Sequence, residues 1–217
     1  MKKLKDYFDY YNNVIRRCET MAIITRDSGL QQSAVDELNQ LIKEIQSLKD
    51  IAINNKDEDD ANGFLSLKCA ASCLQFTIKM WLFLKQEKPD DAWDSLINAQ
   101  DAVVGAIKAH SISSHLENFS ELLQIIEKVV FPPQVFSSAG FTVIDEECSI
   151  CGNNYDKCDH IAGRPYMGKF CYLIVKKAKL NEVSVVKEPS DKKCRVIQFD
   201  DEGGSRNRMT WKLELKK

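Results

Sequence analysis

The sequence predicts an α+β protein, in which an N-terminal all-α bundle of about five antiparallel helices precedes a small, zinc-stapled, β-rich module. Three observations support this prediction. Up to residue 133, apolar residues recur at the three- and four-residue spacing of amphipathic helices. Beyond residue 133, the apolar runs become short and are separated by turns. Within that second part lie four metal-binding side chains, Cys148, Cys151, Cys158 and His160.

Length and charge set broad limits on the function. With 217 residues, the chain has room for one large domain or two small ones, and its hydrophobic fraction of 44% is ordinary for a globular protein. The formal net charge is −2, which provides no global field to attract nucleic acid or anionic lipid. The first residues carry charge but no uninterrupted apolar stretch, so we expect a cytoplasmic protein.

Two amphipathic helices are expected before residue 55. The first presents its apolar face over residues 4–22. Ser28 and Gln31 can form a capping box, which predicts the start of a second helix that ends near Asn54. The polar and acidic residues 55–62 are expected to form a solvated connection or a frayed helix start.

The segment from Phe64 to Leu84 is apolar enough for a membrane span to be considered. Its polar residues recur at steps of three, four and seven, so they line one narrow stripe of a helix. These residues are Lys68, Ser72, Gln75, Lys79 and Gln86. Because lysine is costly in hydrocarbon, we expect the central helix of a bundle with one solvated edge, and no membrane partner.

Two further helices complete the expected bundle. Pro89, followed by two aspartates, predicts a helix start because proline suits the first turn and acidic side chains stabilise its positive end. Ser114 and Glu117 can form a capping box for a fifth helix, which Pro132-Pro133 ends. Short connections favour antiparallel neighbours, so we predict a helical bundle domain at residues 1–133. A helical-repeat solenoid is the alternative.

Residues 134–217 are predicted to form the β-rich module. Its short apolar runs are expected to be strands, and they cover residues 141–144, 170–175, 183–186, 196–199 and 209–215. Val183 and Val185, like Trp211 and Leu213, alternate with polar residues as half-buried strands do. A module of roughly 80 residues is near the size at which a metal or disulfide staple is useful.

The motif Cys148-Ser-Ile-Cys151-Gly predicts a metal-binding turn. Its two thiolates can hold one ion while backbone amides point at the sulfurs, and the glycine permits the positive φ that such a turn needs. Cys158 and His160 are two residues apart and therefore share one face of an extended segment. Four such ligands satisfy the tetrahedral preference of zinc at roughly 2.0–2.3 Å per bond. We therefore predict one structural zinc ion on these four residues.

The exact membership of this ligand set is open at the level of sequence. The second pair is closer together than the usual zinc-ligand spacing. Cys171 lies eleven residues beyond His160 and can replace one ligand, while Cys194 is a weaker reserve. Clustering of cysteines in a chain expected to be cytoplasmic favours a metal over disulfides. The alternative is a loop with reduced, unliganded cysteines.

The sequence does not favour catalysis. Four protein ligands close the zinc shell, whereas a catalytic zinc keeps one position open for water. The zinc deaminase signature, the nucleophile elbow and phosphate-binding glycine loops do not occur in the sequence. His110 and His115 flank a serine-rich turn and are expected to act in capping. We therefore predict no catalytic residues and a protein that is not an enzyme.

A basic stretch supports an alternative function. Lys176, Lys177 and Lys179 lie beside aromatic residues, and Arg206 and Arg208 add positive charge near the C-terminal end. Such a combination can contact nucleic acid. The simpler interpretation is one solvated face of a strand.

Two segments of the module resemble a known family. Cys-Ser-Ile-Cys-Gly at residues 148–152, with Cys-Asp-His-Ile-Ala-Gly-Arg-Pro-Tyr-Met-Gly-Lys-Phe-Cys at 158–171, is similar to a segment in phage and prophage proteins related to prohead maturation proteases. Residues 181–189, with Arg195-Val196, resemble a strand–turn–strand segment of the same family. The resemblance implies a prokaryotic or phage-associated protein. The family's catalytic serine segment has no counterpart here, so no catalytic residue is carried over and Ser184 is not a nucleophile.

These features predict a non-enzymatic, zinc-containing binding or adaptor protein whose helical domain binds a protein partner. Nucleic-acid binding through the basic C-terminal module is one alternative. An unrecognised or degenerate hydrolase of phage or prokaryotic origin is the other.

Overall fold

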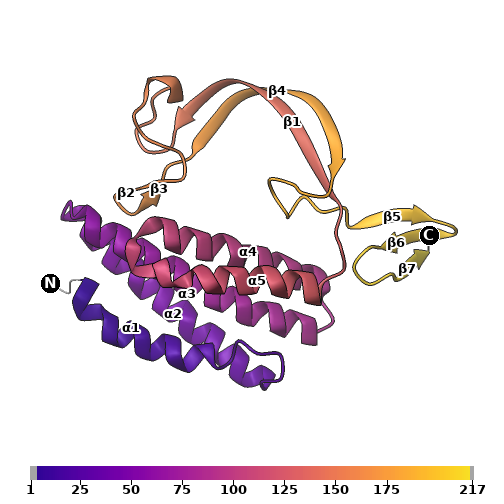
Figure 1. Ribbon diagram of the computed structural model, residues 1–217, viewed down its shortest axis with the longest axis horizontal. Helices are drawn as coiled ribbons and strands as arrows, with labels where there is room; N and C mark the ends of the chain where they lie inside the picture. The colour runs from indigo at the N-terminus through magenta and orange to yellow at the C-terminus, as the bar shows by residue number, and fades with distance from the viewer. Residues whose placement is uncertain (1–3, 216–217) are drawn as a thin grey trace.

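The computed structural model describes residues 4–215, and it confirms a helical bundle followed by small antiparallel sheets (Figure 1). The helices are α1 (Leu4–Glu19), α2 (Ser28–Asn54), α3 (Glu58–Lys85), α4 (Pro89–Ala109), the 3₁₀ helix η1 (Ser111–Leu116), α5 (Glu117–Val130) and the 3₁₀ helix η2 (Tyr155–Lys157). The strands are β1 (Phe136–Cys148), β2 (Pro165–Tyr166), β3 (Lys169–Phe170), β4 (Leu173–Val186), β5 (Gln198–Asp201), β6 (Gly204–Asn207) and β7 (Leu213–Leu215).

The apolar helix α3 is the centre of the bundle. It packs against α2 on one side and α4 on the other, and α1 also contacts it. Its polar stripe lies along α2, where Lys68 Nζ donates to Gln46 Oε1 at 2.7 Å and Gln75 Nε2 donates to Asn39 Oδ1 at 2.7 Å. Within the described chain, α3 is the one helix long and apolar enough to cross a membrane, yet just over half of its most apolar window is buried in the bundle.

The helix starts differ from the predicted capping boxes. Asp27, not Ser28, caps α2 by accepting a hydrogen bond from the Leu30 N–H at 3.0 Å. Asp57 caps α3 in the same way. Residues 55–62 were predicted as a solvated connection or a frayed helix start, and those from Glu58 onwards form the start of α3. Ser114 lies inside η1, and α5 begins without a side-chain cap. Aspartate is the N-cap residue of both helices, because its carboxylate accepts hydrogen bonds from the free amides of the first turn. Its negative charge also interacts favourably with the positive end of the helix dipole.

The main β element is a two-stranded antiparallel ribbon of β1 and β4. Figure 1 shows it as an arch, and three register irregularities interrupt the pairing along it. The runs predicted as separate strands at residues 170–175 and 183–186 differ from the structure, because Phe170 ends β3 and residues 173–186 form one strand, β4. The charged residues between the two runs are exposed and continue the ladder. The prediction that Val183 and Val185 are half-buried is wrong, since they are 64% and 73% exposed.

The terminal sheet also differs from the sequence prediction. β5, β6 and β7 form a three-stranded antiparallel sheet, with β6 in the middle. The run predicted at residues 209–215 is a strand only from Leu213 onwards. Trp211 is 61% exposed rather than half-buried, whereas Leu213 is 39% exposed. Leu215, which continues the predicted alternation, has a side chain outside the described residues. Trp211 and Leu213 stay exposed because no second layer covers this small sheet within the described chain.

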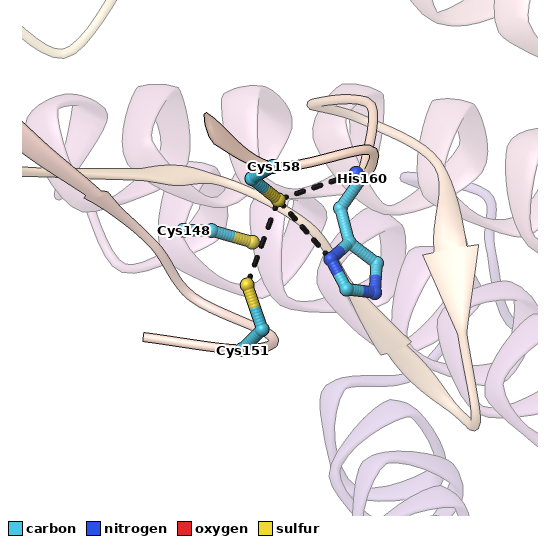
Figure 2. Close-up of side chains that lie close together, drawn as sticks. All are labelled: Cys148, Cys151, Cys158 and His160. Carbon is cyan, nitrogen blue, oxygen red and sulfur yellow. Dashed lines mark hydrogen bonds between the residues drawn. The ribbon is translucent and has the colours of Figure 1, made fainter. Parts of the chain in front are cut away.

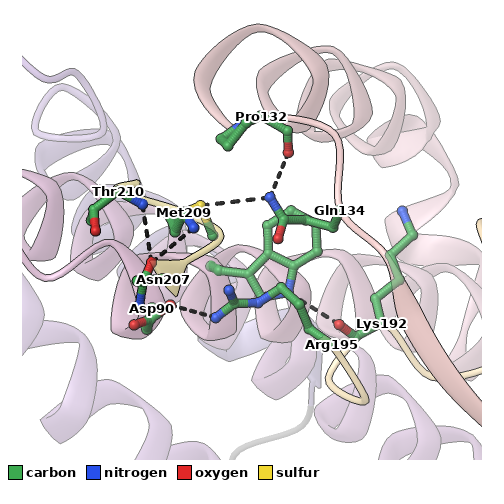
Figure 3. A network of polar contacts seen from close by, with 9 residues as sticks. Asp90, Pro132, Gln134, Lys192, Arg195, Asn207, Met209 and Thr210 are labelled. Atoms are coloured by element: carbon green, nitrogen blue, oxygen red, sulfur yellow. Dashed lines mark hydrogen bonds and ion pairs between the residues drawn. The ribbon is translucent and has the colours of Figure 1, made fainter. Parts of the chain in front are cut away.

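One end of the ribbon is anchored to the bundle through Trp93. Phe136 packs beside the Trp93 ring, with 6.1 Å between ring centroids, and the Trp93 Nε1–H donates to the Lys192 carbonyl oxygen at 3.1 Å. The Arg195 guanidinium lies 5.9 Å from the same ring and pairs with Asp90 at 2.5 Å (Figure 3). Apolar packing and charge pairing therefore hold the start of β1 and residues 192–195 against α4. The division into a helical domain at residues 1–133 and a β-rich module at residues 134–217 stays a prediction.

Candidate metal centre

The metal-binding turn follows directly from the end of β1. Cys148 is the last residue of that strand, and its N–H donates to the Asn153 carbonyl oxygen at 2.8 Å. The Gly152 N–H returns to the Cys148 carbonyl oxygen at 2.8 Å, and the Ile150 N–H points at Cys148 Sγ at 3.4 Å. Gly152 has a φ of +72°, the left-handed conformation that glycine adopts without strain. This turn agrees with the geometry expected from the sequence.

The second pair of side chains comes from the loop after η2. Cys158 has extended backbone angles, which bring its side chain and that of His160 to one side. Cys158 Sγ lies 3.2 Å from His160 Nδ1 and also accepts the His160 N–H at 3.2 Å. The imidazole packs edge-on against the Tyr166 ring, with 4.6 Å between centroids, which fixes its orientation.

Figure 2 shows the four side chains converging on one point. One ligand-type atom from each of Cys148, Cys151, Cys158 and His160 lies within 4.8 Å of all the others, so the group could hold a metal ion. Cys151 Sγ and Cys158 Sγ are 3.6 Å apart. Zinc–sulfur bonds of about 2.3 Å in a tetrahedron place sulfurs roughly 3.8 Å apart, so this separation suits one shared ion.

Cys171 is next to this group but is not a member of it. Its buried sulfur lies 3.7 Å from Cys148 Sγ, which also suits a tetrahedral edge. Cys194 lies apart from the cluster, in the anchor beside α4, where its thiol is 3.8 Å from Asp191 Oδ2. The helical cysteines, like all those in the described chain, are free thiols. Cys171 therefore remains the reserve ligand, whereas Cys194 is not placed to serve as one.

The thiols of the cluster differ in acidity. Burial raises the pKa of Cys148, but hydrogen bonds from the Cys151 and Ile150 N–H groups and from neighbouring thiols outweigh it and lower the pKa to about 6. The pKa of Cys158 is raised to about 11, because burial and contact with the Cys148 and Cys151 sulfurs outweigh the lowering effect of the hydrogen bond from the His160 N–H. One thiolate therefore forms readily, and further thiolates beside it need the charge of a cation.

A short hairpin between these ligands docks on the helical bundle. Met167 and Gly168 both have positive φ and form the two-residue turn between β2 and β3. The Gly168 N–H donates to Asn62 Oδ1 at 2.8 Å, and its carbonyl oxygen accepts from Lys49 Nζ at 3.0 Å. The Phe170 ring lies against Gly105 of α4, 3.6 Å from where a Cβ would stand. The hairpin therefore holds the metal centre against α2, α3 and α4.

The lysine in this contact is buried. Lys49 is 7% exposed, and burial lowers the pKa of its ammonium because the charged form loses water. Nearby Lys68 lowers it further. The Lys49 ammonium donates a hydrogen bond to the Gly168 carbonyl oxygen, and this bond offsets part of the cost of burying the charged group. The sequence did not predict that Lys49, Asn62 and Gly168 meet, because they are far apart in the chain. The Met167-Gly168 dipeptide was the local signal for a turn at this place.

The residues predicted to contact nucleic acid do not form one basic patch. On the ribbon, Lys177 pairs across the strands with Asp145, and Lys176 forms a 2.8 Å ion pair with Glu147. Lys179 is exposed opposite Thr142. In the terminal sheet, Arg206 pairs with Asp201, while Arg208 lines a separate cavity beside Trp93. The acidic strand partners reduce the local positive field, and nucleic-acid binding stays a prediction.

Comparison with known proteins finds no match for this chain. No family model, no curated protein and no solved structure is significantly similar to it. The resemblance to proteins related to prohead maturation proteases therefore stays a hypothesis based on two short segments.

Gly168→Ala tests the docking of the hairpin. A Cβ there would stand 3.1 Å from Lys49 side-chain carbons and 3.2 Å from the Ala61 carbonyl oxygen, in a backbone conformation that alanine disfavours. We expect a loss of at least about 2 kcal/mol in the free energy of unfolding, measured by thermal and chemical denaturation. The matched control is Gly163→Ala, which has the same backbone strain but open space around the new Cβ. It should cost about 1 kcal/mol. Equal losses in both variants would contradict the docking.

Proposed function

We propose that this protein is a non-enzymatic binding protein in which one structural zinc ion, held by Cys148, Cys151, Cys158 and His160, takes the place of a hydrophobic core in the β-rich module. The observation that carries this proposal is the composition of the module's interior. Among described residues 134–213, the buried hydrophobic side chains are Phe136, Cys148 and Cys171. Cys148 is a ligand of the metal centre, Cys171 adjoins that centre, and Phe136 belongs to the anchor on α4. A module built in this way needs a metal to hold its turns together.

The donor set supports zinc in a structural role. Three thiolates and one imidazole suit zinc, which prefers four ligands in a tetrahedron. No carboxylate belongs to the group of ligand atoms found in the described chain. Four protein ligands leave no open position for water, so the ion would supply cross-linking rather than catalysis. Free thiols also suit a reducing compartment, which supports a cytoplasmic location. A prokaryotic or phage-associated origin is supported by the resemblance of the two short segments alone.

The helical domain is the part that we assign to a protein partner. On α5, Leu122, Ile125 and Val129 recur at helical spacing and are 45%, 56% and 78% exposed. The same helix buries only Leu123 fully, although its sequence is strongly amphipathic. An apolar groove of about 180 Å³ lies between α1, α3 and η1 and includes Phe119 at the start of α5. A partner with an apolar helical face fits such a surface.

Substitution of single cysteines tests the zinc site. Cys151→Ser should release the metal and detach the module, while most of the helical circular dichroism signal remains, because helices α1 to α5 do not contain the site. Wild-type protein, purified without added metal, should carry about one zinc per chain by mass spectrometry.

Cys171→Ser is the matched control, since it makes the same change in the cysteine that adjoins the group without belonging to it. It should retain the zinc. Equal loss of zinc from both variants would contradict the assigned ligand set, and a zinc-replete, folded Cys151→Ser variant would contradict the site.

An acidic substitution on α5 tests the partner surface. Ile125→Asp places a charge in the exposed apolar stripe, so binding of a partner identified by affinity capture should weaken by at least about tenfold, as measured by calorimetry. Gln124→Asp adds the same charge at the neighbouring exposed position outside the stripe and should change the affinity little. Unchanged affinity in Ile125→Asp would remove α5 from the interface. A hydrolase activity that depends on one non-ligand residue would contradict the proposed function itself.

A further inference from the structure

The β1–β4 ribbon carries its apolar side chains on one face. Residues directly opposite each other in an antiparallel pair point to the same side. Because successive side chains of a strand alternate between faces, every second pair lies on one face: Ser137 with Val185, Ala139 with Val183, Phe141 with Leu180, and Val143 with Ala178. We call these eight residues the apolar face of the ribbon. The register shift between Gly140 and Phe141 leaves Asn181 without an opposed residue and puts Leu180 opposite Phe141.

The opposite face holds small or polar residues. Its pairs are Ser138 with Ser184, Gly140 with Glu182, and Thr142 with Lys179. The pair that continues this second face toward the anchor, Phe136 with Val186, packs into the core of the bundle. At that end the polar face is therefore the side turned toward the protein interior. This arrangement reverses the usual one, in which the apolar face of a sheet is buried and the polar face is solvated.

The apolar face is exposed along its length. Val143 is 43% exposed, Leu180 53%, Phe141 57%, Val183 64% and Val185 73%. These fractions amount to apolar surface on the order of 500 Å² per chain, which is at the upper end for a single patch on a monomer. No charged residue belongs to this face, whereas Glu182 and Lys179 lie on the other. A complementary surface must therefore be apolar and uncharged too.

We propose that a second copy of this chain covers the apolar face, so that two ribbons pack face to face in a symmetric dimer. An isolated two-stranded ribbon is marginally stable, and a second ribbon supplies the missing layer. The face has a self-complementary profile, because the large Phe141 and Leu180 are flanked by the small Ala139 and Ala178. Two such patches bury on the order of 1,000 Å² in total, near the lower limit of specific interfaces, so the dimer is weak. The inference depends on the ribbon alone and not on the partner surface of α5.

Sedimentation velocity over protein concentrations from about 1 μM to about 500 μM tests the proposal. The full chain should pass from monomer to dimer within this range. Val183→Lys puts a charge in the centre of the apolar face and should weaken dimerisation by at least about tenfold. Glu182→Gln makes the same change in net charge at the neighbouring residue on the other face and should leave the dimer intact.

Two outcomes would overturn the proposal. One is a wild-type chain that stays monomeric at every concentration. The other is a dimer that Val183→Lys leaves unchanged. Because Val183 is exposed, the variant should keep the thermal midpoint of the wild-type monomer; if it does not, Leu180→Gln provides a second, uncharged variant of the same face with the same expected loss of dimer.

Discussion

The amide of Gly168 is held from both sides by the helical bundle. Asn62 accepts its N–H at 2.8 Å, and the buried ammonium of Lys49 donates to its carbonyl oxygen at 3.0 Å. A side chain at this position would meet Lys49 and the Ala61 carbonyl oxygen, so the contact requires glycine. The hairpin lies between the Cys158–His160 pair and Cys171. This contact therefore positions the metal centre on the bundle, together with the packing of Phe170 against Gly105. The start of β4 follows directly from the hairpin.

Two anchors of different chemistry therefore support the ribbon. At one end, apolar packing and charge pairing around Trp93 hold Phe136 and Arg195. At the other end, the hairpin holds the metal centre, and the centre holds the last residue of β1. Between the anchors the ribbon buries little of its own surface, and its apolar face is open. We propose that zinc and a second ribbon together stabilise the module, as a hydrophobic core stabilises larger domains.

Features encoded by nearby residues were predictable from the sequence, whereas long-range pairings were not. Periodicity predicted the helices, and the spacing of Cys148, Cys151, Cys158 and His160 predicted that they meet, since all four lie in one short segment. The predicted N-cap was wrong where two neighbouring side chains can both accept from the same amides, as Asp27 and Ser28 can. Alternation predicted a buried face for Val183 and Val185, but it does not say which face meets solvent. The pairing of Lys177 with Asp145 and the contact of Lys49 with Gly168 depend on tertiary structure alone.

The central claim concerns the atoms around the metal, and X-ray absorption at the zinc edge measures them directly on protein purified without added metal. The account predicts a shell of three sulfur atoms at about 2.3 Å and one nitrogen at about 2.0–2.1 Å. A shell of four sulfurs would mean that Cys171 replaces His160, and would contradict the ligand set. Absence of zinc would contradict the idea that a metal takes the place of the module's core.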